Sequence, residues 1–177
     1  MKKIVFTLTT LVALAFVFAF TLPSNWSIAP RYNISFTTSG VSGIFKKFDG
    51  NIVFDEQNIG ASKFDVTIDV NSINTGNGMQ NKHAKGSDWF DAARYPSIKF
   101  SSQKFMKVGT AYQVTGNLQV HGITKSASIP FTFKRAGNGG TFEGIFNVNR
   151  NDFGIGKPAG EVGDVIKLVV SVPVTKK

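Results

Sequence analysis

The sequence predicts an all-β protein of roughly eight to ten short antiparallel strands, interrupted by one short helix. Three observations support this fold class. Apolar and polar residues alternate with a period of two, turn-forming residues separate the alternating segments, and helical composition is confined to one stretch. The apolar face of each strand must be buried, either between two sheets of a sandwich or inside a closed barrel. A barrel leaves no exposed strand edge, and short turns suit an up-and-down arrangement.

The alternation recurs along the chain in residues 33–37, 63–70, 98–101, 112–121, 126–133 and 165–174. In residues 63–70 every even position is apolar and every odd position is polar, which is typical of a strand with one buried face. The last segment contains more apolar residues than the others, which predicts that both of its faces are covered. Turn residues occur between these segments, at 49–50, 58–60, 108–110, 136–140 and 160–163.

The alternation stops between residues 79 and 93, where Lys, Ala, Asp and aromatic residues occur without proline. We predict a short helical insertion near residues 80–92, ending before Tyr95-Pro96. His83, one of the chain's two histidines, lies in this stretch near Asp88. The insertion is therefore also the first place to look for an active site.

The N-terminus has two lysines followed by an apolar segment from Ile4 to Leu22. This pattern is typical of a secretory signal, although the length is also close to that of a membrane span. We expect residues 1–22 to be a signal peptide, with a retained anchor as the alternative. Residues 23–177 then form one domain, periplasmic or secreted.

Composition excludes several classes of site. The chain has no cysteine, so disulfides, thiolate zinc sites and a cysteine nucleophile are excluded. The formal net charge is +9, but lysines are scattered in runs of no more than two. This distribution favours a basic soluble surface over a nucleic-acid site, and it is compatible with weak attraction to an anionic membrane.

Catalysis requires groups that the sequence does not place together. A shared site of His83 and His121 is disfavoured because the alternation puts His121 on the polar face of its strand. A catalytic triad of Ser87, His83 and Asp88 is disfavoured, because the chain has no G-x-S-x-G nucleophile elbow. The glycine-rich segments lack the spacing of a phosphate-binding loop. We predict no catalytic residue, metal or cofactor. An enzyme that depends on His83 and Asp88 is the weakest of the alternatives.

The chain contains 17 phenylalanines, and many of them occupy the apolar positions of the alternation. Such rings can pack together and fill a barrel. They can equally line an apolar tunnel that holds a ligand. The alternation does not distinguish these two interiors.

Three blocks of sequence resemble the YceI-like family of lipid- or polyisoprenoid-binding, lipocalin-like periplasmic proteins. The first block contains Trp26, ISF at 34–36, VSGIFKKFDG at 41–50 and IVFD at 52–55. The second contains QNKHA at 80–84, DWF at 88–90 and YPSIKF at 95–100. The third contains GNLQVHGITK at 116–125 and NDFGIG at 151–156. Together the blocks extend over nearly all of residues 26–174.

The resemblance implies an extended eight-stranded antiparallel barrel with a helix at one end and a long apolar cavity. It implies a carrier of an apolar lipid, such as a polyisoprenoid or an isoprenoid quinone, and no catalysis. The family shows an Arg-Asp pair where this chain has Gln80-Asn81, and a Leu where it has Ala84. We therefore expect any ligand head-group contact at this point to differ from that in relatives.

The expected ligand-lining residues occupy the inward apolar positions and the helical insertion: Phe36, Phe64, Val66, Ile68, Trp89, Phe90, Phe100, Val114, Leu118, Phe131, Phe133 and Phe146. Gln80, Asn81, His83 and Asp88 are expected to lie at the cavity mouth or to anchor the helix. The expected partner is an apolar isoprenoid lipid, with weak association to anionic membranes and a homodimer as further options. The alternative function is a basic protein with a filled barrel that binds membrane or polymer through its surface.

Overall fold

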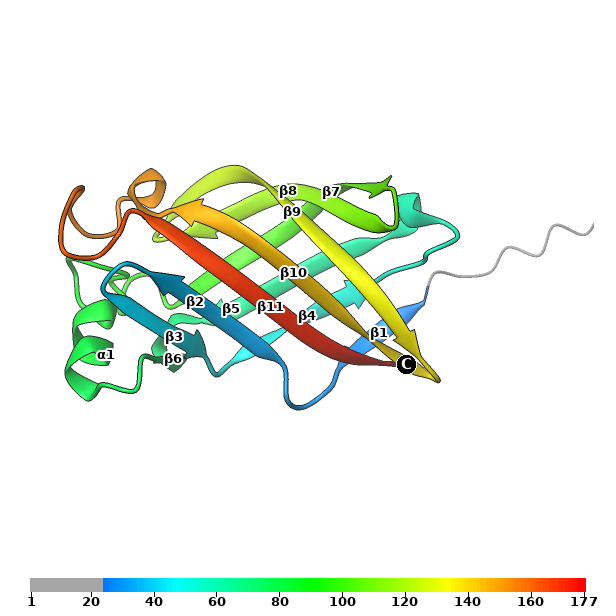
Figure 1. Cartoon of the computed structure of the whole chain (residues 1–177), viewed down its shortest axis with the longest axis horizontal. Coiled ribbons are helices and arrows are strands. Elements are labelled where there is room, and N and C mark those ends of the chain that lie inside the picture. The colour runs from blue at the N-terminus through cyan, green and yellow to red at the C-terminus, as the bar shows by residue number, and fades with distance from the viewer. Residues whose placement is uncertain (1–23) are drawn as a thin grey trace, which may run out of the picture.

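Long antiparallel strands wind around a common axis in the computed structural model, which describes residues 24–177 (Figure 1). The expected signal peptide at residues 1–22 lies outside the described residues. The strands are β1 (Asn25–Ile28), β2 (Asn33–Thr38), β3 (Val41–Phe45), β4 (Phe48–Val53), β5 (Lys63–Asp69), β6 (Ile73–Asn74), β7 (Ser97–Val108), β8 (Ala111–Val120), β9 (Ile123–Ala136), β10 (Gly139–Asn149) and β11 (Val165–Lys176). The helical elements are α1 (Gly78–Lys85) and the short 3₁₀ turns η1 (Ile59–Ala61), η2 (Val70–Ser72) and η3 (Arg150–Phe153).

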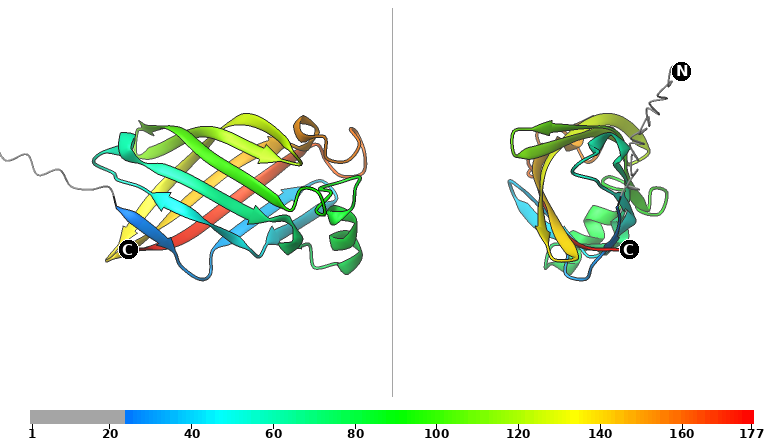
Figure 2. Two further views of the ribbon diagram at one scale, coloured as in Figure 1. Left: turned by 180° about the vertical axis from the view of Figure 1, so that it is seen from behind. Right: turned by 90° about the vertical axis from the view of Figure 1, so that its right-hand side faces the viewer.

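The strands close into an eight-stranded barrel, which confirms the fold class predicted from the sequence. The ring runs β1-β4-β5-β7-β8-β9-β10-β11, and β1 pairs back onto β11. β2, β3 and β6 extend β1, β4 and β5 toward the helix, so three strands of the barrel each consist of two segments. Seen end-on, the strands encircle a central axis (Figure 2).

Side chains bridge the places where these three strands are interrupted. Pro30 lies between β1 and β2, where it cannot donate a ladder hydrogen bond. The Tyr32 hydroxyl donates to the Lys46 carbonyl and accepts from the Phe48 N–H, both at 3.0 Å. Between β5 and β6, the Ser72 hydroxyl accepts from the Lys47 N–H at 3.0 Å, and the Ser72 carbonyl accepts from the Lys46 N–H at 3.1 Å. These contacts keep the wall continuous although the regular ladder stops.

Helix α1 begins and ends earlier than the sequence predicted. Asn77 caps it, because its side-chain oxygen accepts from the N–H groups of Met79 and Gln80 at 2.9 and 3.2 Å. The helix ends at Lys85, where Gly86 follows. Residues 86–96 form consecutive turns instead of the predicted helical continuation to residue 92. In the described part of the chain, no helix is long and apolar enough to cross a membrane.

An aromatic cluster fills the end of the barrel opposite α1. Phe54 lies at its centre and contacts the rings of Phe64, Tyr112, Phe131, Phe133 and Phe142, with centroids 5.1–6.3 Å apart. The Trp26 indole N–H donates to the Phe54 carbonyl at 3.0 Å. Most of these ring pairs meet edge to face, the arrangement that aromatic quadrupoles favour. The barrel is therefore closed at this end by its own side chains.

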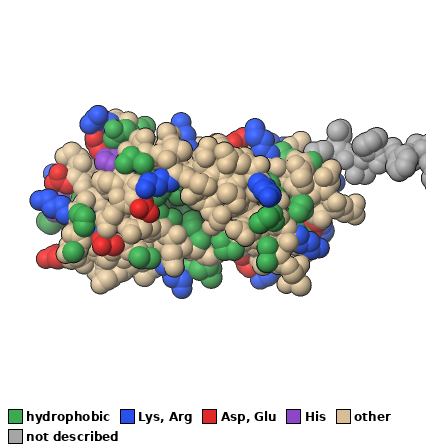
Figure 3. Space-filling view, turned by 90° about the horizontal axis from the view of Figure 1, so that it is seen from above, with side chains coloured by type: hydrophobic (Ala, Val, Ile, Leu, Met, Phe, Trp, Pro, Cys, Tyr) green, Lys and Arg blue, Asp and Glu red, His purple; other side chains and the backbone are tan. Residues whose placement is uncertain are grey.

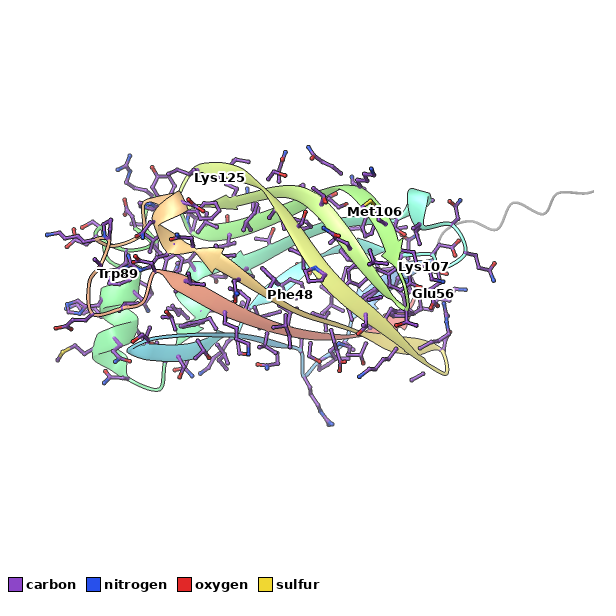
Figure 4. All side chains as sticks on the ribbon, turned by 45° about the horizontal axis from the view of Figure 1, so that its top comes forward. Phe48, Glu56, Trp89, Met106, Lys107 and Lys125 are labelled. Atoms are coloured by element: carbon purple, nitrogen blue, oxygen red, sulfur yellow. The ribbon has the colours of Figure 1, made fainter. Side chains whose placement is uncertain are left out.

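The Tyr112 hydroxyl brings no charge into this aromatic cluster. Burial raises the pKa of the Tyr112 hydroxyl, and the nearby Glu56 carboxylate raises that pKa further. Both effects favour the neutral form, in which an ordinary tyrosine also exists at physiological pH. Figure 4 shows Glu56 at this end of the barrel and Trp89 at the helix end.

The final strand is less covered than its apolar composition predicted. β11 lies between β10 and the β1–β2 strand, and its even positions face the interior. Its odd positions face outward, where Val165 is 54% exposed. No second layer packs on this outer face within residues 24–177. The prediction that both faces are covered is therefore wrong, because apolar residues of β11 simply remain at the surface.

The aromatic cluster predicts a large loss of stability on truncation. Phe54→Ala should lower the free energy of unfolding by about 3–5 kcal/mol, because it leaves a cavity among five rings. Urea unfolding followed by circular dichroism measures this. Val108→Ala, at an exposed position of the same end, is the control and should change stability by less than about 0.5 kcal/mol. Equal stability of the two variants would contradict the packed end.

Candidate ligand-binding cavity

A cavity of about 440 Å³ lies inside the helix end of the barrel. Strands supply its walls through residues such as Phe36, Ile68 and Leu168, whose side chains all point inward. The helical insertion supplies its cover through Ala84, Trp89 and Phe90. The remaining cover comes from the β2–β3 turn and the segment between η3 and β11. The cavity is thus bounded by the strands and by the irregular segments at one end of the barrel.

A second cavity of about 140 Å³ continues the first one deeper into the barrel. Ile68, Ile98, Leu118 and Phe146 line both cavities. The deeper cavity ends among aromatic rings that include Phe64, Phe131 and Phe142, which belong to the cluster around Phe54. The two cavities therefore adjoin each other, and together they are called the channel below, which aromatic rings close along the barrel axis.

Polar side chains are concentrated at the outer end of the channel. Gln80, His83 and Glu161 line it from exposed positions, and Thr75 lines it from a half-buried one. Within residues 24–177, every buried side-chain nitrogen and oxygen has a hydrogen-bond partner. The channel therefore offers no buried polar group that needs a ligand to satisfy it. Its chemistry suits a hydrocarbon body with a polar end at the mouth.

Arg150 is the one fully buried charged residue of the described chain, with 3% of its surface exposed. Its guanidinium donates to the carbonyls of Ile155, Lys157, Val162 and Gly163 at 2.7–3.1 Å. It also donates to the Asp164 carboxylate at 2.7 Å and the Asn151 side chain at 3.2 Å. Because its five N–H groups are all used, Arg150 has no donor left for an anionic ligand. Its function is to fix the segment that covers the cavity.

The same arginine joins the two halves of the cover. Its guanidinium lies 5.5 Å from the centre of the Trp89 ring, a cation–π contact. Gly156 passes between them with φ of +65°, and a side chain there would lie 3.0 Å from the guanidinium. The Gly156 N–H donates to the Asp88 carbonyl at 2.9 Å. The segment after η3 and the helical insertion are thus fastened to one another.

The structure places most residues predicted to line the ligand on one of the two cavities. Six line the outer cavity: Phe36, Ile68, Trp89, Phe90, Leu118 and Phe146. Five more line only the inner one: Phe64, Val66, Phe100, Val114 and Phe131. Phe133 lines neither, because it packs on Trp26 and Phe142 with centroids 5.2 and 4.5 Å away. Phe133 belongs to the aromatic cluster and not to the channel.

The four residues predicted for the mouth or for anchoring the helix take different roles. Gln80 and His83 line the mouth. Asn81 anchors α1, because its side-chain oxygen accepts from the N–H and the hydroxyl of Thr75 at 2.8 and 2.9 Å. Asp88 contributes only its backbone carbonyl, described above. Within residues 24–177, the side chains of His83 and Asp88 make no hydrogen bond or ion pair.

His121 lies away from any shared site with His83. It occupies the turn between β8 and β9, where its Nδ1 lies 3.1 Å from the Phe153 carbonyl oxygen and its ring packs on Tyr95. It lines neither cavity. No group of three potential metal ligands occurs in the part of the chain that the structure describes.

Sequence reasoning missed Arg150 and the lining residues that come from turns and strand ends. The latter include Val41, Phe45, Ile73, Val120, Phe153 and Ile155. Phe153 and Ile155 are apolar residues in a glycine-rich segment, which the period-two pattern does not assign to any face. The only sequence signal for Arg150 was its position, as a single arginine between an alternating strand and the glycine-rich segment.

A closed eight-stranded antiparallel barrel with an apolar channel under a helical cover is a lipocalin-like barrel. Residues 25–174 match the model of the YceI-like domain, and the chain belongs to this family. It is 33% identical to the protein YceI of Salmonella arizonae over 144 residues, which cover 76% of this chain and 73% of that protein. The resemblance noted in the sequence is confirmed.

Solved structures share the fold. BcnA of Burkholderia cenocepacia superposes with a TM-score of 0.81 at 28% identity, covering 84% of this chain and 100% of that chain. A polyisoprenoid binding domain from Saccharophagus degradans superposes with a TM-score of 0.64 at 11% identity, covering 89% of this chain and 100% of that chain. At 11% identity the second comparison shows the fold alone.

The buried arginine predicts a second loss of stability. Arg150→Met should lower the free energy of unfolding by about 3–5 kcal/mol, because it leaves buried carbonyls and Asp164 without their donor. Hydrogen exchange of residues 154–164 should accelerate in this variant. Arg94→Met, at an exposed arginine of the same end, is the control and should behave like the wild type. Unchanged exchange in Arg150→Met would contradict its anchoring role.

Proposed function

We propose that the protein binds the hydrocarbon chain of an isoprenoid-type lipid in the channel, and that it carries or sequesters this lipid. One observation carries the proposal. The channel is apolar along its length and is closed along the barrel axis by aromatic rings, and the polar side chains that reach it lie at the mouth. A long hydrocarbon with one polar end has the matching distribution of polarity.

The energetics support a hydrocarbon ligand. Each square ångström of apolar surface moved from water into the channel contributes about 25 cal/mol to binding. Phenylalanine rings and branched aliphatic side chains form the wall. An isoprenoid chain is itself branched and has no polar atom along its body, so it leaves no group unpaired when it is buried.

The comparisons support the same ligand class. The Saccharophagus degradans neighbour is described as a polyisoprenoid binding domain. The present chain belongs to the YceI-like family and carries the channel that such a ligand requires. A filled barrel that acts only through its surface is disfavoured, because the aromatic cluster fills one end of the interior and the other end is hollow.

Polar side chains at the mouth surround the polar end of the ligand in this proposal. Gln80 and His83 project from α1, and Glu161 lies on the opposite cover segment. In this proposal these groups contact the polar end of the ligand and perform no chemistry. Gln80 stands where the family resemblance places an arginine, which favours a ligand end of lower negative charge at this position.

The location belongs to the same proposal. Residues 1–22 have the pattern of a secretory signal, which supports a lipid carrier outside the cytoplasm, in a periplasm or secreted. Residues 23–177 hold 18 Lys+Arg and 11 Asp+Glu, and their net charge of +7 supports weak, salt-sensitive attraction to anionic membranes, from which an apolar ligand is loaded.

Blocking the mouth tests the proposal. Ala84 lines the outer cavity from α1, so Ala84→Trp should weaken binding of farnesol and solanesol by at least about tenfold. Calorimetric titration of detergent-solubilised lipid measures the affinities. Ala93→Trp, at an exposed position of the same insertion, should bind both lipids like the wild type. If neither lipid binds to the wild-type protein, or if Ala84→Trp binds both fully, the proposed function is wrong.

A further inference from the structure

β9 and β10 are paired over only part of their length. Their register runs from Gly139 opposite Ala136 to Glu143 opposite Thr132. Beyond this point β9 continues toward Ile123, still paired to β8, and β10 continues to Asn149, still paired to β11. Figure 1 shows the first half of β9 arching away from β10. The barrel wall is therefore open between these two half-strands.

Local sequence explains where the pairing stops. Pro130 has no N–H, so it cannot continue the ladder toward β10. Gly144 lies beside it, and a Cβ there would already be 3.0 Å from the Pro130 carbonyl oxygen. The strands are thus in close contact at Gly144 and separate on the side that leads toward the helix.

The inner cavity reaches this opening. Ile129 of β9, and Gly144 and Phe146 of β10, line it from the interior. Glu143 lines it as well, although its carboxylate is 2.7 Å from the Lys134 ammonium and its side chain is 42% exposed. Glu143 borders the cavity only through its apolar atoms, while its carboxylate lies at the outer surface, so the inner cavity extends to this gap in the wall.

The inner rim of the opening is apolar, and exposed apolar residues lie among polar residues such as Ser128 and Asn147 on its outer face. Ile145, on the outer face of β10 at the edge of the opening, is 58% exposed, and Ile123 at the start of β9 is 40% exposed. Ala127 and Val148 line the inner rim as partly buried residues packed on the core. Figure 3 looks down on this side of the barrel and shows hydrophobic side chains along its middle. An apolar rim favours a hydrocarbon over a polypeptide strand, which would use the unpaired backbone groups.

The opening is bounded at its other end. The Lys125 ammonium lies 3.6 Å from the Asp152 carboxylate, and the His121 ring contacts the Phe153 carbonyl at 3.1 Å. These contacts tie η3 to the β8–β9 turn, and Figure 4 shows Lys125 beside η3. The gap is consequently a window in the wall and not a frayed end of the barrel.

We propose that this window between β9 and β10 is a second ligand site, through which the distal part of a long isoprenoid chain leaves the channel. The inner end of the channel is blocked by the aromatic cluster around Phe54, so a chain longer than the channel cannot pass along the barrel axis. The window is the apolar route that remains. This inference rests on the proposed function and adds to it that the protein accepts chains longer than its interior.

Closing the window tests the proposal. Because the chain has no cysteine, Ser128→Cys and Asn147→Cys can be joined across the window by a short bismaleimide cross-linker. The matched control joins Lys134→Cys and Thr141→Cys, which face each other in the paired part of the same strands and line neither cavity. Ala127→Trp, which places an indole on the inner rim, is an independent variant. Affinities for farnesol, a short isoprenoid alcohol, and solanesol, a long one, are measured before and after cross-linking.

The expected result is a selective loss for the long chain. Cross-linking at 128 and 147, or Ala127→Trp, should weaken solanesol binding by at least about tenfold and farnesol binding by less than about twofold. The control cross-link should change neither affinity. The proposal is overturned if solanesol affinity is unchanged in both modified proteins, or if both alcohols lose affinity equally. Failure of both alcohols to bind the unmodified protein overturns the proposed function instead.

Discussion

The aromatic packing around Phe54 is the contact on which the rest of the account depends. Because Trp26, Tyr112 and several phenylalanines fill that end of the barrel, the hollow part of the interior is confined to the helix end. The same packing closes the channel along the barrel axis. A ligand's polar end is therefore restricted to the mouth under α1, and its hydrocarbon body must point toward the rings. A barrel hollow along its whole length would impose neither restriction.

Polar side-chain contacts hold the cover of the channel in place, whereas backbone hydrogen bonds between strands hold the wall. Arg150 gathers four backbone carbonyls and one carboxylate from the segment before β11, and it packs on Trp89 of the helical insertion. Asn77 and Asn81 fix α1 at its start. Each of these sets of hydrogen bonds depends on a single charged or amide side chain at one position in the sequence. The cover can therefore be well ordered without closing the interior with apolar side chains, which leaves the channel free.

The all-β class and most of the wall could be predicted from the sequence, because a strand with one buried face must alternate. That rule assigns Phe64 and Leu118 to the interior whatever their neighbours are. It cannot separate Phe131, which reaches the channel, from Phe133, which lies in the aromatic cluster, because both occupy inward positions of β9. Depth along the barrel axis depends on strand tilt and register. The function of Arg150 depends on the course of an irregular segment, for which no periodicity exists.

The central claim is that the hollow half of this barrel is a ligand site and not a packing defect. The most direct measurement is a crystal structure of the protein saturated with solanesol. The account predicts continuous hydrocarbon density from the mouth beside Gln80 and His83, past Trp89, to the rings of Phe64 and Phe131. A channel that is empty or collapsed at saturation, with the lipid bound on the outer surface, would contradict it.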